Sequence, residues 1–394
     1  MFESFAMPHV SAPGKMFLAG EWAILEPGNS GLVGAVDKRV HALVEERPSE
    51  GPQPTVSISI DDFGIKDRRT QFDGKHLLFS PELTEEEKPK FKFIKEAIEA
   101  ALQYIQPQFP LKSFSIRTWG ELSQIEVEEI DAEGIRKKQV KKVGFGSSAA
   151  AVVAAIAGTL ELHGIHLEKH REQVFKLAAA AHYFAQGKLG SCFDIAASTY
   201  GGVFSYVAPD LKAVAERMAS QTVKAVADSR WPLLHIQPLE VPEDFNLAVG
   251  WTKQSASTTD MIKAMNVWKE QNRSSYDAAI ERIAEVVDLI IQAWKLKDRD
   301  RILELVKQNR AALAELTKLS GVPIETDDLR KLAEIADQNG AAGKLSGAGG
   351  GDCGIAFCFD SRVAEVVKSA WQAAGLWPLD AMLDRQGVRV EKNV

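Results

Sequence analysis

Cysteine is scarce in this sequence: Cys192, Cys353 and Cys358 are the only three among 394 residues. They form no CxxC pair, and the histidines form no cluster at zinc-ligand spacing. A disulfide framework and a structural zinc site are therefore excluded. The pattern predicts a protein of a reduced, cytoplasmic setting.

Long apolar runs are also missing. The most apolar stretch, Ala149–Leu162, has about fourteen residues, whereas a membrane-spanning helix needs about 20. We expect it to be a buried helix. The first ten residues carry Glu3 and lack both a basic region and a long apolar core, so they do not resemble a secretion signal.

No excess of positive charge is present, because 47 basic and 54 acidic residues leave a formal net charge of −7. A general attraction to nucleic acid or to an anionic membrane is therefore not expected. Hydrophobic residues at 45% and charged residues at 26% are typical of a globular protein. Any anionic ligand must be held by a local site.

Hydrophobic periodicity predicts a mixture of strands and helices. Strands are predicted at 33–44, 55–60, 113–118, 245–251, 352–359 and 387–390. Helices are predicted at 91–105, 148–163, 168–186, 328–339 and 362–374, together with a long helical region at 258–319 that breaks near 272–275. Prolines at 232, 238 and 242 indicate a boundary. We therefore predict an α+β protein with two domains, 1–235 and 236–394.

The first segment with chemical potential is Ser11–Glu21. Pro13 and Gly14 set a bend, and Lys15 then begins a short apolar strand, which places an ammonium group where a ligand can approach the backbone. A surface turn with a solvated lysine is the alternative interpretation.

The second segment, 142–150, contains the glycine-rich turn Gly144–Ser148 immediately before a helix rich in alanine and valine. Glycines let successive N–H groups point inward, and the helix start adds about half a positive charge, which favours phosphates. Two hydroxyls, Ser147 and Ser148, are available for Mg²⁺. The alternative is a tight turn in which Ser147 is a plain helix cap. Among the basic residues before the turn, only Lys142 is assigned a ligand role.

The third segment, 344–353, has four glycines within five positions, at 347 and 349–351. Such a run loses much backbone entropy on folding, so we expect a close approach that requires it. A loop packed against a neighbouring element is the alternative.

Two other nucleotide motifs are rejected. Residues 144–149 satisfy the dinucleotide pattern GxGxxG/A, and Glu168 follows at about the expected distance, but no strand is predicted where that acidic residue would sit. A P-loop is absent as well, because Leu345 stands where Ser or Thr is required after Gly343-Lys344.

The order and spacing of the three segments resemble the GHMP small-molecule kinases across nearly the whole sequence. The resemblance implies an N-terminal domain like domain 2 of ribosomal protein S5 and a ferredoxin-like C-terminal domain. It implies ATP and Mg²⁺ as cofactors, and Lys15 and Asp194 as the catalytic residues. The implied ATP contacts lie in the second and third segments and are Lys142, Gly144, Phe145, Gly146, Ser147, Ser148, Ser346, Gly347, Ala348, Gly349 and Gly350.

Within this family, four segments are most similar to the phosphomevalonate kinases. They are Glu21–Gly28, Lys142–Ser148, Ala185–Ala197, and Gly250–Thr252 followed by Ala256–Thr258. This similarity implies transfer of a phosphoryl group from ATP to 5-phosphomevalonate. The alternatives are another GHMP kinase, acting on mevalonate or a sugar, and a non-catalytic relative that binds nucleotide.

The implied acceptor contacts are polar or glycine residues of these segments: Lys15, Lys188, Ser191, Asp194, Lys253, Ser257, Thr258 and Gly349. For the lysines and the two hydroxyls near 257, a helix-surface or helix-cap role is the alternative. The resemblance implies a small-molecule substrate and no nucleic-acid or membrane partner, and it is compatible with a monomer or a homodimer.

The sequence departs from the family pattern at two positions. Phe145 replaces a more usual leucine. His182 stands where mevalonate kinases have a Mg²⁺-binding glutamate. The metal is therefore assigned to Ser147 or Ser148, and its second protein ligand stays open. Because a phosphate acceptor is already largely ionised at neutral pH, we expect Lys15 to contribute more than Asp194, whose main work is orientation. A helix-cap or turn carboxylate is the alternative for Asp194.

Overall fold

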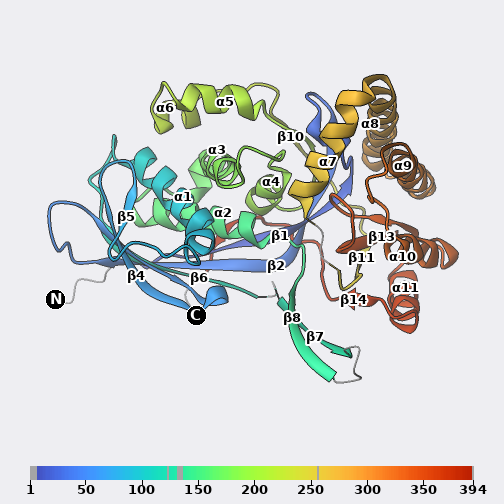
Figure 1. The fold of residues 1–394 in the computed structure, drawn as a ribbon, viewed down its shortest axis with the longest axis horizontal. Helices are drawn as coiled ribbons and strands as arrows, with labels where there is room; N and C mark the ends of the chain where they lie inside the picture. The colour runs from blue at the N-terminus through green and yellow to red at the C-terminus, as the bar shows by residue number, and fades with distance from the viewer. Residues whose placement is uncertain (1–6, 122–123, 131–135, 255–256, 393–394) are drawn as a thin grey trace.

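A computed structural model describes residues 7–392 apart from 122–123, 131–135 and 255–256. The side chains of 124–130 and 136–142 also lie outside the described part. The chain forms two lobes side by side, a larger one with a wide sheet and a smaller one built from the later helices and strands (Figure 1). The predicted α+β class and two-lobed fold are confirmed.

The larger lobe is built on β2 (Ser30–Arg47). Strand β1 (His9–Ala19) pairs antiparallel with β2 along most of its length. The same β2 also pairs with β9 (Val203–Val207) near its start and with β6 (Ser113–Gly120) near its end. The sheet continues through β3 (Thr55–Ile60), β4 (Ile65–Phe72) and β5 (Leu77–Phe79), and β10 (His235–Leu239) extends it beyond β9.

Helices cover one face of this sheet (Figure 1). They are α1 (Lys88–Ile105), α2 (Ser147–Leu162), α3 (Leu167–Ala185) and α4 (Phe193–Tyr200), with the short α5 (Leu211–Met218) and α6 (Val223–Asp228) lying outside them. Helix α2 contacts β1, β2, α1, α3 and α4, so nearly its whole circumference is buried. This explains why its sequence from Ala149 to Gly158 contains no polar side chain. Among the described residues, no helix has the length and apolar character needed to cross a bilayer.

The smaller lobe contains a four-stranded antiparallel sheet in the order β12 (Ala342–Leu345), β13 (Cys353–Cys358), β11 (Asn246–Trp251), β14 (Trp377–Leu379). Its helices are α7 (Thr258–Gln271), α8 (Arg273–Leu296), α9 (Arg299–Ser320), α10 (Asp327–Gln338) and α11 (Ser361–Ala373). Taken in chain order, the strands lie as 4-1-3-2 with helical connections after the first and third, which is the expected ferredoxin-like arrangement.

The long helical region predicted at 258–319 breaks at Asn272, as expected, and a second time at Lys297–Asp298. Lys297 adopts a left-handed backbone conformation, and the Asp298 side chain accepts a hydrogen bond from the Arg301 amide at the start of α9. The prediction of an uninterrupted helix across 297–298 was wrong. The apolar periodicity resumes directly after the turn, so the sequence does not reveal the aspartate cap that starts α9.

The chain crosses between the lobes more than once. Strand β10 still pairs with β9 in the larger sheet, and residues 381–391 return to that sheet, where β15 (Arg389–Val390) pairs with β1. We call 381–391 the return segment. A division at 235/236 therefore falls inside β10 and places the return segment in the second domain, although both join the sheet of the larger lobe.

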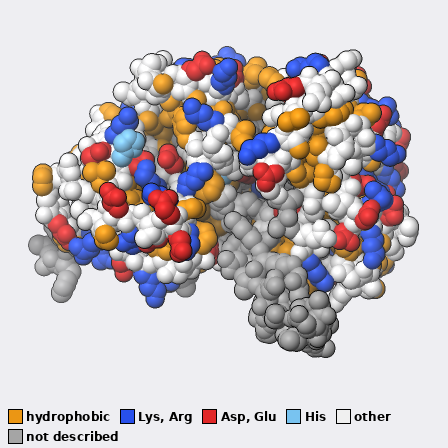
Figure 2. Space-filling model, in the orientation of Figure 1, with side chains coloured by type: hydrophobic (Ala, Val, Ile, Leu, Met, Phe, Trp, Pro, Cys, Tyr) orange, Lys and Arg blue, Asp and Glu red, His pale blue; other side chains and the backbone are white. Residues whose placement is uncertain are grey.

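One hairpin projects from the body of the molecule (Figure 1). It consists of β7 (Gln124–Ile130) and β8 (Arg136–Lys142), and it leads directly into the glycine-rich turn before α2. On the face drawn in Figure 2, basic and acidic side chains are interspersed, in keeping with the near balance of charges in the sequence.

Candidate functional site

Lys15 lies on the glycine-rich turn that precedes α2. Its amide donates to the carbonyl of Phe145 at 2.8 Å, and its ammonium donates to the carbonyl of Gly144 at 2.6 Å. The ammonium also lies 5.9 Å from the centre of the Phe193 ring, the first residue of α4. The half-buried lysine therefore does not sit on an isolated surface turn, and the first two predicted segments meet at its side chain.

The start of α2 is open for an anion. Gly146, not Ser147, occupies the capping position, and within the described chain no side chain caps the helix. The first amides of a helix have no partner in the helix itself, so they are free to bind phosphate oxygens. The predicted alternative, in which Ser147 is a plain cap, is therefore wrong. The Phe145 ring is buried in the core, so this residue offers a ligand only its backbone.

The third segment closes against the second through Asp352. The amide of Gly144 donates to Asp352 Oδ1 at 3.1 Å, and a β-carbon on Gly144 would lie only 1.7 Å from Asp352 Oδ2. Burial raises the pKa of the Asp352 carboxyl, while the Lys15 ammonium and the Gly144 amide oppose that rise. The three segments therefore meet, with Lys15, Gly144 and Asp352 at the point of contact.

Much of the third segment packs onto neighbouring elements. The buried Ser346 hydroxyl accepts from the Phe17 amide and donates to the Phe17 carbonyl, both at 3.0 Å. A β-carbon on Gly349 would lie 2.1 Å from the Ile324 carbonyl oxygen. These packing contacts explain why a serine stands at 346 and a glycine at 349. By contrast, a β-carbon on Gly347 would meet no atom within 4 Å, so this residue faces open space.

A buried ion pair joins the first and third segments. The Lys344 ammonium pairs with the Glu21 carboxylate, and both side chains are inaccessible to solvent. Burial raises the pKa of Glu21, although the Lys344 charge and the Gly347 amide oppose the shift. Together with the 3.2 Å hydrogen bond from Trp22 Nε1 to the Ala348 carbonyl, this pair fixes the glycine loop on the end of β1.

Asp194 belongs to a second polar group at the site. It is the second residue of α4, whose capping position is Cys192, so Asp194 is not the helix cap. Its Oδ1 accepts from the Ile195 amide at 2.9 Å, so the carboxylate does bond the first turn of the helix, as the turn-carboxylate alternative holds. Its Oδ2 lies 3.9 Å from His182 Nε2, and the same nitrogen lies 3.3 Å from the Ser148 hydroxyl. Burial lowers the pKa of His182, which favours the neutral ring, while the Asp194 charge opposes that shift. The His182 ring thus lies within hydrogen-bond distance of the Ser148 hydroxyl and near, but not bonded to, the Asp194 carboxylate.

The predicted acceptor residues divide into two groups. Ser191 and Thr258 line one small cavity of about 80 Å³, together with Phe193, Gly347 and residues of the first segment. Lys188 and Ser191 line an adjoining cavity of about 500 Å³ between the lobes. These positions could contact one small molecule.

The remaining predicted positions lie differently. Ser257 accepts from the Asp260 amide at 3.3 Å and so caps α7, as the alternative interpretation held. The Lys253 ammonium lies 5.5 Å from the centre of the Trp377 ring. The side chain of Lys142, at the end of β8, lies outside the described residues. The ligand roles predicted for Lys142, Lys253 and Ser257 stay predictions.

The donors at the site fit a Mg²⁺ ion that arrives with a nucleotide. Over the described ranges, no group of three or more His, Cys, Asp or Glu side chains converges as a metal site. Nucleotide-bound Mg²⁺ usually takes only one or two protein oxygens beside the phosphates and waters. The Ser148 hydroxyl and the Asp194 carboxylate, both close to His182 Nε2, are oxygens of this kind.

Sequence reasoning missed three charged residues of this site: Glu21, Lys344 and Asp352. Each stands at the edge of a segment that was singled out, and Lys344 lies within an apolar strand that buries it completely. A charged residue in such a strand is a signal of a buried ion pair. Its partner could not be read from the sequence, because Glu21 lies 323 positions away.

Comparison with known families supports this geometry. Residues 92–202 match the GHMP kinases N terminal domain, and residues 278–375 match the family described as GHMP kinases C terminal. Both matches include elements of the site, since the first covers the turn before α2 and the second covers the glycine loop.

Individual proteins are similar along nearly the whole chain. The phosphomevalonate kinase of Streptomyces sp. (strain CL190) is 29% identical over 96% of this chain and 97% of its own. The crystal structure of a Lin0012 protein from Listeria innocua has a TM-score of 0.83 at 32% identity, covering 98% of this chain and 100% of that one. The Streptococcus pneumoniae phosphomevalonate kinase in complex with phosphomevalonate and AMPPNP has a TM-score of 0.74 at 26% identity, covering 95% and 98%.

Proposed function

The chain belongs to the GHMP kinases, and we propose that it is a phosphomevalonate kinase. It transfers the γ-phosphoryl group of ATP to the phosphate of (R)-5-phosphomevalonate, giving (R)-5-diphosphomevalonate and ADP. The observation that carries the proposal is the position of the Lys15 ammonium on the Gly144 carbonyl, beside the uncapped start of α2. Similarity to phosphomevalonate kinases over nearly the whole chain supports the choice of acceptor.

The reaction brings two polyanions together, so charge neutralisation is the main task of the protein. A phosphate monoester has a second pKa near 6 and is largely a dianion at neutral pH, so no strong base is needed to make it a nucleophile. Phosphoryl transfer depends on positioning and on cations and dipoles aimed at the developing charge. Lys15 and the first amides of α2 supply a cation and a dipole from two different elements.

The remaining residues position the reactants. Ser148 and Asp194 would hold Mg²⁺ when it is bound with ATP, and the ion neutralises charge on the nucleotide phosphates. His182 hydrogen-bonds the Ser148 hydroxyl and so helps to orient it beside the Asp194 carboxylate. Gly347 faces open space at the edge of the small cavity, so the backbone of the third segment can approach a phosphate there. Ser191 and Thr258 would contact the acceptor.

The test is a comparison of acceptors with the purified protein. Initial rates of ADP formation are measured with 5-phosphomevalonate, mevalonate and galactose at equal concentrations in the presence of ATP and Mg²⁺. We expect kcat/KM to be highest for 5-phosphomevalonate. A preference for mevalonate or the sugar would assign a different acceptor within the family. Binding of ATP without turnover of any acceptor would identify a non-catalytic relative and refute the proposal.

A further inference from the structure

Strand β2 carries two extra residues opposite the point where β1 reaches Lys15. In the antiparallel pairing, Pro13 lies opposite Arg39, but Gly14 lies opposite Val36, so Asp37 and Lys38 have no partner on β1. Irregularities of this kind bend a strand and redirect its side chains, and they occur beside active sites. The direction of Lys15 therefore depends on what holds this irregular stretch in place.

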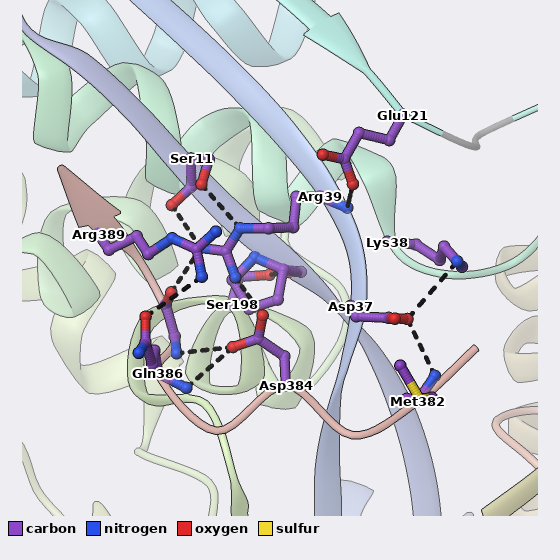
Figure 3. Close-up of polar contacts among 12 residues, drawn as sticks. Ser11, Asp37, Lys38, Arg39, Glu121, Ser198, Met382, Asp384, Gln386 and Arg389 are labelled. Carbon is purple, nitrogen blue, oxygen red and sulfur yellow. Dashed lines mark hydrogen bonds and ion pairs between the residues drawn. The ribbon is translucent and has the colours of Figure 1, made fainter. Parts of the chain in front are cut away.

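The buried side chain of Arg39 holds this irregular stretch of β2 in place. The Arg39 guanidinium donates from Nε to the Ser11 hydroxyl at 2.7 Å and from Nη2 to the Ser11 carbonyl at 2.9 Å. Nη2 also donates to the Gly387 carbonyl at 2.7 Å, and Nη1 pairs with the Asp384 carboxylate. Figure 3 shows this cluster, in which the return segment passes beneath β1 and β2. Arg39 thus connects β1 and β2 with residues more than 340 positions later in the chain.

Asp384, the ion-pair partner of Arg39, fixes the return segment against β2. Its Oδ1 accepts from the amides of Gln386 and Gly387 at 2.9 and 3.1 Å, which fixes the turn of the return segment. Its own amide donates to the Ala35 carbonyl at 2.9 Å. Ala35 is the residue directly opposite Lys15 in the sheet. The return segment is therefore bonded to the cross-strand partner of the lysine.

The return segment also contacts the helix that carries Asp194. A β-carbon on Gly387 would lie 2.4 Å from the carbonyl oxygen of Thr199, in the last turn of α4. From the same turn, the Ser198 hydroxyl donates to the Pro13 carbonyl at 2.7 Å. One buried cluster thus contacts β1 just before Lys15, and it contacts α4 four to five residues after Asp194.

We propose that Arg39 and Asp384 are positioning residues for phosphoryl transfer, which set the separation and direction of the Lys15 ammonium relative to Asp194. The inference rests on the proposed function, because it assumes that these two groups act on the same reaction. Neither residue touches the site directly. Misplacement of reacting groups by about 1 Å can cost roughly 100-fold in rate, so a rigid connection between the two elements has a kinetic consequence.

Two single variants and one double variant separate this role from general stability. Asp384→Asn keeps the shape of the side chain and removes its charge. Arg39→Lys keeps the charge and removes the planar fork that reaches four acceptors at once. In a double variant, Arg39→Met with Asp384→Leu, both charges are replaced by apolar side chains, which often preserves stability in a buried pair. The control is Glu99→Gln, which neutralises another buried carboxylate, paired with Lys95 on α1.

The first readout is steady-state kinetics with 5-phosphomevalonate, below the unfolding temperature of each variant. For Asp384→Asn, Arg39→Lys and the double variant, we expect kcat to fall by about 10- to 100-fold while KM for ATP stays within about threefold. Glu99→Gln is expected to keep kcat within about twofold of the unaltered protein, even if its unfolding temperature falls as far as those of the Arg39 and Asp384 variants. A folded Asp384→Asn or double variant with the kcat of the unaltered protein would overturn the inference.

The second readout does not depend on the acceptor. Amide hydrogen exchange is followed in peptides covering 11–17 and 193–202. We expect faster exchange in both peptides for the Arg39 and Asp384 variants, and unchanged exchange there for Glu99→Gln. Unchanged exchange in the Arg39 and Asp384 variants would overturn the inference. If the unaltered protein does not turn over 5-phosphomevalonate, the proposed function fails, while the exchange experiment still decides whether this cluster couples the two elements.

Discussion

The amide of Gly144 donates a 3.1 Å hydrogen bond to the Asp352 carboxylate, although the two residues are 208 positions apart. Gly144 belongs to the turn before α2 in the larger lobe, and Asp352 directly precedes β13 in the smaller lobe. The contact therefore joins the two lobes where the phosphate-binding turns meet. With the Lys15 ammonium on the carbonyl of the same glycine, it sets the geometry of the proposed nucleotide site.

Gly144→Ala is expected to separate the two loops. The added β-carbon would lie 1.7 Å from Asp352 Oδ2 and 2.7 Å from its Cγ, so the carboxylate must move and lose its hydrogen bond from the amide. Overpacking of this kind typically costs about 1–3 kcal/mol in the free energy of unfolding. We expect weaker ATP binding in titration calorimetry and a lower midpoint in urea. Gly51→Ala, at a position with no atom within 4 Å, is the control. Equal ATP affinity in both variants would contradict the assigned contact.

Lys15→Met is expected to reduce kcat more than Asp194→Asn does. Removal of one preorganised group that stabilises transition-state charge typically costs 100- to 1,000-fold, and we expect Lys15→Met at about the upper value. For Asp194→Asn we expect a loss of at most about 100-fold, because the phosphate acceptor is already ionised and the asparagine keeps one oxygen for the Mg²⁺ that comes with ATP. Steady-state rates with 5-phosphomevalonate measure both. A greater loss for Asp194→Asn would show that the aspartate, not the lysine, dominates.

Acid is expected to destabilise the fold partly through His163. This buried ring accepts from the Lys112 amide at Nε2 and bonds the Thr159 carbonyl through Nδ1, an arrangement that suits the neutral form. Burial lowers its pKa from the usual 6.5. Below about pH 6.5 the unfolded chain therefore binds a proton that the folded chain resists, so stability falls as the pH falls. One such group contributes a slope of up to about 1.4 kcal/mol per pH unit.

Urea unfolding between pH 7.5 and 5.0 tests this prediction. We expect His163→Gln to make the loss of stability toward low pH shallower, whatever its effect at pH 7.5. His235→Gln, which alters an exposed histidine on β10, should leave the slope unchanged. Parallel pH profiles for the unaltered protein and His163→Gln would exclude the histidine as a source of acid sensitivity.

Patterns that depend on near neighbours in the chain were predictable. The alternation at Thr55–Ile60 gave a strand with one buried face, and the alanine-rich stretch after Gly146 gave a helix buried almost all round. The break at Asn272 was expected, while the break at Lys297 was hidden because the apolar period resumes on both sides of one left-handed residue. Short segments such as α4 and β12 carry too few residues for a period to be recognised.

The proline-glycine bend predicted before Lys15 is wrong, because Pro13 and Gly14 lie within β1, where the pairing with β2 is irregular. By itself, the sequence determined the rest of the local chemistry: a lysine on an apolar strand, a glycine turn at the start of a helix, and a loop rich in glycine. These follow from backbone preferences and from neighbours within a few residues. Only the tertiary structure decided which of these groups meet. It joined Asp352 to Gly144, His182 to Ser148 and Asp194, and Arg39 to Asp384. The physical reason is that such contacts are set by how whole sheets and helices pack, and neither partner's own sequence neighbourhood specifies that packing.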